Sequence, residues 1–154
     1  MTTLKTIDEF LGSKRLAVVG VSHNPKDFTR SLFRELRTRG YDLVPVHPEA
    51  AEIEGIPAVA HVTDASPAVE GALLLTKPQV TTEVVRECHQ AGIERIWMYR
   101  ATGAGAVSAD AVEFCRSHGM QVVAGECPFM FLPNTGFPHN FHGFCKKLVG
   151  RFPK

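Results

Sequence analysis

The chain of 154 residues has a formal net charge of +1 at pH 7, and 44% of its residues are hydrophobic. This length and composition are typical of one domain with its own core, and the balanced charge gives no indication of a nucleic-acid partner. No apolar run approaches the roughly 20 residues that cross a bilayer, and residues 1–5 lack the apolar region of a secretory signal. We therefore expect a single cytoplasmic domain over residues 1–154, without a membrane segment.

A short helix followed by a buried strand opens the predicted fold. Residues 6–9 have the form of a capping box that begins at Thr6, and Gly12 follows as a stop, so a helix is expected between them. Residues 16–21 are a continuous apolar run of strand length. Such a run is typical of a strand that is buried on both faces of a parallel sheet.

Three later segments repeat the pattern of an amphipathic helix, a glycine and a strand. The helical stripes contain Leu32, Phe33 and Leu36; Val80, Val84, Val85 and Cys88; and Ala111, Val112 and Cys115. They end at Gly40, Gly92 and Gly119, before strands expected at residues 41–46, 93–99 and 120–124. A glycine at this position turns the chain back towards the sheet, so the repeat predicts an α/β fold.

The apolar residues 71–76 add a fifth main strand, and a short extra strand is expected near residues 56–60. We predict a Rossmann-like, doubly wound, mainly parallel sheet of about five strands with helices on both faces. The core of this domain is expected at about residues 14–128. After it, prolines interrupt the apolar pattern and residues 139–149 favour a helix, so residues 129–154 are expected to form a C-terminal helical extension.

Three loops follow strands at the edge where doubly wound sheets bind ligands. Ligands lie beyond the carboxyl ends of the strands where the crossover direction reverses, which selects the loops after the first, third and fourth main strands. These are residues 22–29, 77–78 and 100–108. The last of them contains Gly103 and Gly105, where backbone can approach a ligand, although a plain connection that ends at a Ser108 cap is the alternative.

The first of these loops matches only part of the dinucleotide fingerprint. Gly20 is present, but Ser22 and Pro25 replace the later glycines of G-x-G-x-x-G. The end of the second strand, at His47, has no carboxylate placed to hold a ribose diol. Both observations disfavour a nicotinamide dinucleotide.

A helix start after a buried strand still suits a pyrophosphate, because backbone N–H groups and the helix dipole favour an anion. Coenzyme A (CoA) has a pyrophosphate and adds a ribose 3′-phosphate, which favours cations. Lys26, Arg30 and His47 are the nearby candidates. Each of them has an alternative role as an ordinary solvated side chain. The residues therefore favour CoA over NAD.

Five short motifs occur in order along this framework. They are Gly-Val-Ser-His-Asn-Pro at 20–25, Gly-Tyr at 40–41, Val-Pro-Val-His-Pro at 44–48, Ile-Glu-Gly at 53–55 and Thr-Lys-Pro at 76–78. Together they resemble the small stand-alone CoA-binding domain family, which is similar to the N-terminal domain of the succinyl-CoA synthetase α subunit. The resemblance implies a Rossmann-like fold that binds CoA or an acyl-CoA along the strand ends.

The resemblance also implies roles for individual positions. It places the pyrophosphate at the loop from Gly20 to Pro25, with Thr29 as the cap of the next helix, the adenosine beside residues 47–48, and the pantetheine along residues 77–78. The candidate ligand-binding residues are Gly20, Ser22, His23, Asn24, Pro25, Lys26, Thr29, Arg30, His47, Pro48, Thr76, Lys77, Pro78 and Gly103. The sequence departs from the family pattern at His47, where asparagine is common, and at Asp27, where a basic residue is common.

No complete catalytic constellation is visible, and none is predicted. Cys88, Cys115, Cys127 and Cys145 lack a C-x-x-C spacing and are expected to be reduced thiols, mostly in the core. His139 and His142 precede Cys145 at a loose helical spacing that does not predict a metal site.

The leading hypothesis is a non-catalytic carrier, sensor or regulatory module for CoA. A homo-oligomer is compatible with this hypothesis. Three alternatives stay open: an NAD(P)-binding oxidoreductase, a partner-dependent component of an acyl-CoA ligase, and an interaction protein that uses residues 129–137 as an interface.

Overall fold

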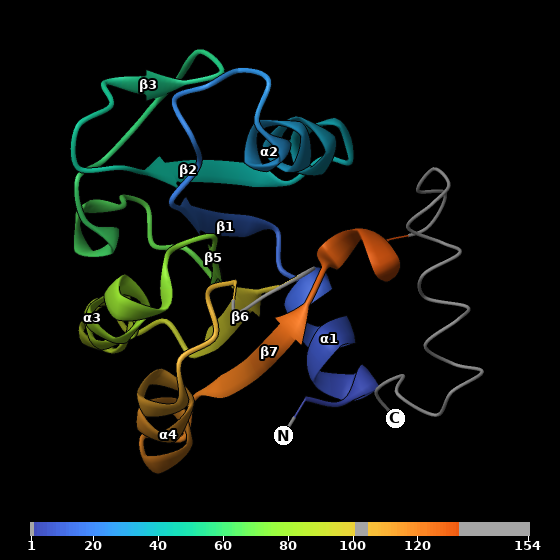
Figure 1. The fold of residues 1–154 in the computed structure, drawn as a ribbon, viewed down its shortest axis with the longest axis vertical. Coiled ribbons are helices and arrows are strands. Elements are labelled where there is room, and N and C mark those ends of the chain that lie inside the picture. Colours follow the sequence, from blue (N-terminus) through green and yellow to red (C-terminus); the bar gives the residue numbers. More distant parts are fainter. Residues whose placement is uncertain (1, 101–104, 133–154) are drawn as a thin grey trace.

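The computed structural model describes residues 2–100 and 105–132 (Figure 1). The main strands in this part are β1 (Arg15–Val19), β2 (Asp42–Val46), β5 (Gly71–Leu74), β6 (Arg95–Tyr99) and β7 (Gln121–Glu126). The helices are α1 (Leu4–Leu11), α2 (Phe28–Thr38), α3 (Pro78–Gln90) and α4 (Ala109–Ser117). Two short strands, β3 (Glu52–Ile53) and β4 (Ile56–Pro57), and the 3-10 turns η1 (Val62–Asp64) and η2 (Pro128–Met130) complete the described elements.

The five main strands form one parallel sheet in the order β2-β1-β5-β6-β7. This confirms the predicted α/β, Rossmann-like architecture with five main strands. The order runs outwards in both directions from β1 and β5, so the crossover direction reverses between these two strands. A crevice for a ligand is expected outside their carboxyl ends.

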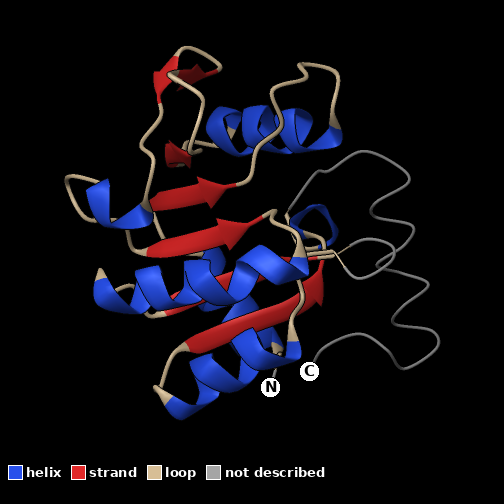
Figure 2. Cartoon of the chain, turned by 60° about the vertical axis from the view of Figure 1, so that its left-hand side comes forward, coloured by secondary structure: helices blue, strands red, loops and turns tan. Residues whose placement is uncertain are grey.

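Helices cover both faces of the sheet, as predicted (Figures 1 and 2). Leu16 and Val18 of β1 pack in the cluster that contains residues of α1 and α2, whereas Ala17 and Val19 pack in the cluster that contains residues of α3 and α4. Alternate residues of a strand point to opposite faces, so a strand between two helical layers needs an unbroken apolar run. This explains the apolar segment that begins at Leu16.

Several local predictions are confirmed, and one is wrong. The predicted turning glycines Gly40, Gly92 and Gly119 all have positive φ angles, of 94°, 76° and 70°. The capping box, by contrast, begins at Thr3 and not at Thr6: the backbone N–H of Thr6 donates to Thr3 Oγ1 at 3.1 Å, and the backbone N–H of Thr3 donates to Thr6 Oγ1 at 2.9 Å. A threonine thus stands at the N3 position, where the usual capping box has a glutamate or glutamine.

The short extra strand that was predicted near residues 56–60 is β4. It pairs antiparallel with β3, and Val59 forms an isolated bridge with Val46 of β2. The predicted final helix at residues 139–149 lies outside the described residues, as does most of the predicted extension. Within residues 2–100 and 105–132, no helix is long and apolar enough to cross a membrane.

Candidate ligand-binding site

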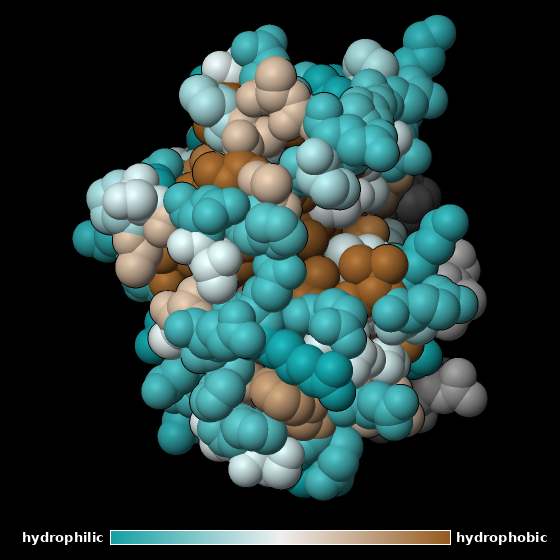
Figure 3. Space-filling model, turned by 90° about the vertical axis from the view of Figure 1, so that its left-hand side faces the viewer, coloured by the Kyte–Doolittle hydropathy of each residue, from teal (hydrophilic) through white to brown (hydrophobic). Residues whose placement is uncertain are grey.

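A pocket of about 420 Å³ lies at the carboxyl ends of β1, β2 and β5, at the crevice that the strand order predicts. Five of the predicted ligand-binding residues line it: Gly20, His47, Pro48, Thr76 and Lys77. Much of the remaining wall is apolar and comes from Val19, Val46, Val62, Leu75, Val80 and Val84. Figure 3 faces the α3 side of the molecule and shows hydrophobic surface in the middle of this side, bordered by hydrophilic side chains.

One wall of this pocket was not predicted from the sequence. It is formed by His61 and Val62 at η1 and by residues of α3 that include Glu83 and Glu87. His61 Nδ1 lies 3.1 Å from Glu87 Oε1, and the Val62 N–H donates to Glu87 Oε2 at 3.3 Å, which ties η1 to α3.

Val80 also belongs to this wall. The sequence places it in the apolar stripe of α3, but it is 47% exposed and lines the pocket. An exposed aliphatic residue on a helix of this kind is a reason to look for a binding surface.

The loop after β1 is held together by its own side chains. Ser22 Oγ accepts from the Asn24 N–H at 3.1 Å, and Asn24 Oδ1 accepts from the Lys26 N–H at 3.0 Å. The Ser22 N–H donates to Thr29 Oγ1 at 2.9 Å. Several of the amide donors that the sequence assigned to a phosphate are therefore already paired within the loop.

Asp27, and not Thr29, caps helix α2, which corrects the cap that the resemblance implied. The Asp27 carboxylate accepts from the Thr29 N–H at 2.8 Å and from the Thr29 hydroxyl at 2.7 Å. Both hydrogen bonds lower the pKa of Asp27, and the one from the Thr29 side chain has the larger effect. A carboxylate consequently occupies the helix start where an anionic ligand group was expected.

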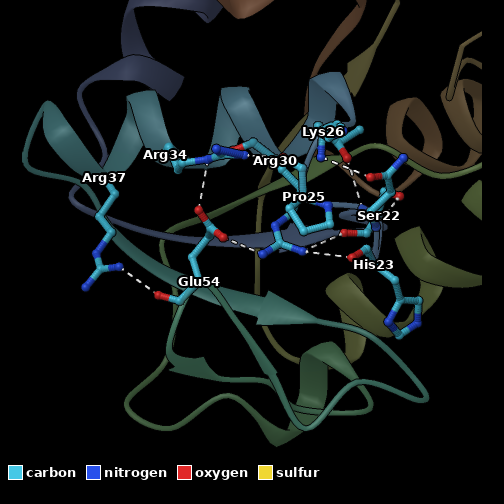
Figure 4. A network of polar contacts seen from close by, with 10 residues as sticks. Ser22, His23, Pro25, Lys26, Arg30, Arg34, Arg37 and Glu54 are labelled. Carbon is cyan, nitrogen blue, oxygen red and sulfur yellow. Dashed lines mark hydrogen bonds and ion pairs between the residues drawn. The ribbon is translucent and has the colours of Figure 1, made fainter.

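Arg30 is buried and does not line the pocket. Its guanidinium lies between Glu54 and the loop after β1 (Figure 4). Its Nη1 donates to the carbonyl oxygens of Ser22 and His23, each at 3.2 Å, and its Nη2 pairs with the carboxylate of Glu54. Arg30 thus holds the loop through two of its backbone carbonyl groups. Lys26 and Lys77 form no ion pair with any described residue, so their ammonium charges remain for a ligand to neutralise. Lys77 lines the pocket, and Lys26 belongs to the loop after β1.

His47 is held as a neutral imidazole. Its Nδ1 accepts from the backbone N–H groups of Glu49 at 3.0 Å and Ala50 at 3.1 Å, so the ring proton of the neutral form is on Nε2. Burial, followed by repulsion from His23, lowers the pKa of His47, and the opposing effect of Glu49 is smaller. The His23 ring lies edge-on to that of His47, with the centroids 4.2 Å apart. Near neutral pH, His47 can therefore donate one hydrogen bond to a ligand but supplies no positive charge.

We expect the thermal stability of the protein to fall as the pH is lowered through 6.5, the ordinary pKa of histidine. In that range the unfolded chain takes up a proton at His47 that the folded protein does not bind, so the contribution of this residue is complete above pH 6.5 and is lost below it. His47→Asn keeps an oxygen acceptor for the two N–H groups but cannot titrate. Between about pH 5 and 7, its melting temperature should vary less than that of the native protein, by a few degrees. An equally steep fall in both proteins would contradict this.

Thr76 offers the pocket a hydrogen-bond acceptor. The buried Thr81 Oγ1 lies 2.7 Å from the Ala106 carbonyl oxygen and 3.1 Å from that of Lys77. Because its single proton must go to a carbonyl oxygen, the Thr76 hydroxyl, 2.8 Å away, is the donor in the Thr76–Thr81 hydrogen bond. The lone pairs of Thr76 then remain for an N–H group of a ligand.

The same contact of Thr81 joins the start of α3 to the loop after β6. The N–H of Ala106 donates to the Tyr99 carbonyl oxygen at 2.8 Å, which closes this loop against the end of β6. Gly103 lies outside the described residues, so its role stays a prediction. The structure therefore joins the loops at Thr76 and Ala106 through one buried hydroxyl group.

The described cysteines are core residues, as predicted. Cys88, Cys115 and Cys127 are all buried. Burial raises the pKa of Cys88 to about 12 and that of Cys115 to about 11, so both are protonated thiols at neutral pH. Cys145 and the two histidines that precede it lie outside the described residues.

Comparisons with known proteins agree with this geometry. The chain is 23% identical over 129 residues to the α subunit of the ADP-forming acetate–CoA ligase II of Pyrococcus furiosus, and the match covers 79% of this chain but 28% of that protein. The uncharacterized protein YneT of Bacillus subtilis is 24% identical over 115 residues, covering 75% of this chain and 82% of that protein.

A solved structure is also similar, that of a hypothetical protein from Pyrococcus horikoshii OT3. It has a TM-score of 0.76 at 27% identity, over 82% of this chain and 87% of that one. The family model of the CoA binding domain matches residues 14–133, which include every described residue that lines the pocket. The chain therefore belongs to the CoA-binding domain family.

Proposed function

We propose that the protein binds CoA or an acyl-CoA across the carboxyl ends of β1 and β5, as a non-catalytic carrier, sensor or regulatory module. The observation that carries this proposal is the pocket at the reversal point of the sheet, which brings together Gly20, His47 and Thr76 from three different loops. A cytoplasmic location and a homo-oligomer remain predictions from the sequence.

The charges around the pocket support one placement of the ligand. Glu83 and Glu87 lie on the α3 wall and would repel a phosphate, whereas the adjoining valines favour an uncharged group. Thr76 accepts a hydrogen bond there, which suits the adenine amino group or a pantetheine amide. We therefore place an uncharged end of CoA in the pocket and its phosphates outside, within reach of the ammonium groups of Lys26 and Lys77.

CoA should raise the melting temperature, whereas NAD and NADP should leave it unchanged. At a CoA concentration 100 times the dissociation constant, linkage adds about 2.7 kcal/mol to the free energy of unfolding, and at 2–4 °C per kcal/mol the melting temperature rises by roughly 5–10 °C. Thermal unfolding followed by circular dichroism measures this shift. A shift with NADP and none with saturating CoA would refute the proposal and favour the oxidoreductase alternative.

A lysine variant locates the site in the same experiment. Lys77→Gln should weaken CoA binding at least about tenfold, because a charge-assisted contact to phosphate is lost. Lys14→Gln is the matched control, since Lys14 is an exposed lysine at the opposite, amino end of β1. Equal losses in both variants would show that overall charge and not the pocket determines affinity.

The similarity to the α subunit of an acetate–CoA ligase favours a second candidate, a component that acts with a partner. The chain spans 28% of the length of that subunit, so we expect no formation of ATP from acetyl-CoA, ADP and phosphate by the purified chain. Turnover by the chain alone would contradict the proposed non-catalytic role.

A further inference from the structure

The hairpin between β3 and β4 turns through a residue in an unfavourable conformation. Glu54 has a φ angle of 50° and is the one described non-glycine residue with a positive φ, and Gly55 follows with 77°. A two-residue turn of this kind favours asparagine or glycine at its first position, whereas a glutamate there adopts the left-handed conformation at a cost in free energy. We therefore expect interactions of the Glu54 side chain to offset this cost.

Three arginines of α2, which follow one another at helical spacing, contact Glu54 (Figure 4). Arg30 Nη2 pairs with Glu54 Oε2, and Arg34 Nε lies 2.9 Å from Glu54 Oε1. Arg37 Nη1 donates to the backbone carbonyl oxygen of Glu54 at 2.9 Å. The hydrogen bond from Arg30 is the largest of the effects that lower the pKa of Glu54, so the carboxyl is ionised at neutral pH.

Arg30 connects this cluster to the loop after β1. It is 9% exposed, so its charge requires a partner inside the protein, and Glu54 is the carboxylate that pairs with it. The other terminal nitrogen of Arg30 holds the carbonyl oxygens of Ser22 and His23. Arg34 adds a second contact to the loop through the carbonyl oxygen of Pro25. The carboxylate of Glu54 thus fixes two arginine side chains, and these together hold three backbone carbonyl groups of the loop.

We propose that Glu54 is a positioning residue for ligand binding, which sets the conformation of residues 22–25 through Arg30 and Arg34. The proposal rests on the proposed CoA site, because it states why the loop beside that site has a defined conformation before the ligand arrives. Preorganisation of this kind raises affinity, since the loop need not be ordered on binding.

The first measurement is made on the full chain in the absence of a ligand. Amide hydrogen exchange at Asn24 and Lys26, whose N–H groups are bonded within the loop, should become about tenfold faster in Glu54→Gln and Glu54→Gly, the effect of losing one charge-assisted contact. Glu54→Gly also relieves the backbone strain, so its melting temperature should fall less than that of Glu54→Gln. Glu54→Asp keeps the charge and should restore part of the protection. Glu52→Gln removes an exposed carboxyl of the same hairpin and is the control.

CoA affinity, measured by isothermal titration calorimetry, is the second readout. We expect it to fall about tenfold in Glu54→Gly and to stay unchanged in Glu52→Gln. Native exchange rates at Asn24 and Lys26 in a folded Glu54→Gly would overturn the positioning role, whatever the ligand. Faster exchange in that variant, together with no CoA binding by the native protein, would retain Glu54 as the residue that orders the loop and refute only the proposed ligand.

Discussion

Replacement of Gly20 by alanine is expected to lower the free energy of unfolding by about 3 kcal/mol and to abolish CoA binding. Gly20 has a φ angle of 92°, which a residue with a side chain rarely adopts, and a Cβ there would lie 2.9 Å from the carbonyl oxygen of Leu75 and 3.2 Å from the Thr76 nitrogen. The methyl group can be accommodated only if the ends of β1 and β5 separate. These strand ends form the pocket, so stability and affinity should be lost together.

Gly40→Ala is the matched control for this variant. Gly40 has nearly the same φ angle, 94°, but nothing within 4 Å of its Cβ position, and it is not among the residues that line the pocket. Its free energy of unfolding should fall only by the cost of the strained backbone, about 1–2 kcal/mol, and it should bind CoA normally. Urea denaturation and calorimetry of both variants separate the two effects. Equal destabilisation of both, with CoA binding intact in Gly20→Ala, would show that the close approach of β1 to β5 does not shape the site.

Replacement of Trp97 by alanine is expected to cost about 3–5 kcal/mol, a large part of the 5–15 kcal/mol that typically stabilises a domain. Trp97 is in the middle of β6, is fully buried and packs edge-on against Phe10 of α1, with ring centroids 5.3 Å apart. Its Nε1 also donates to the Glu126 carbonyl oxygen at 2.8 Å, which ties the middle of β6 to the end of β7. The alanine variant leaves a cavity and removes this donor.

Trp97→Phe distinguishes packing from hydrogen bonding. It retains most of the apolar contact but removes the indole donor, so it should cost only about 1–3 kcal/mol. Because Trp97 is the only tryptophan of the chain, unfolding of both variants is followed by circular dichroism and not by fluorescence. A loss in Trp97→Phe as large as that in Trp97→Ala would show that the hydrogen bond, and not the filling of the core, is the main contribution.

The order of helices and strands was readable from the sequence because it depends on local patterns. The apolar run that begins at Leu16, the helical stripe of Leu32, Phe33 and Leu36, and the glycine that ends each helix are all signals within a few residues. They predicted an α/β sheet of five main strands with helices on both faces. The loops after β1 and β5 followed from the general rule for ligand sites in such sheets.

The tertiary structure decided which groups of these loops can contact a ligand, because their partners lie far apart in the chain. Arg30 and His47 were predicted as cations for a phosphate, and local sequence gives no information about a carboxylate 24 positions after Arg30 or about the two N–H groups that point at the His47 ring. Likewise, the wall from η1 and α3 reaches the pocket only once the strand order β2-β1-β5 has brought these elements together. Continuous apolar runs and apolar stripes of period 3.6 therefore determined which elements form. Long-range packing and the pairing of buried charges determined which side chains remain free to meet a ligand.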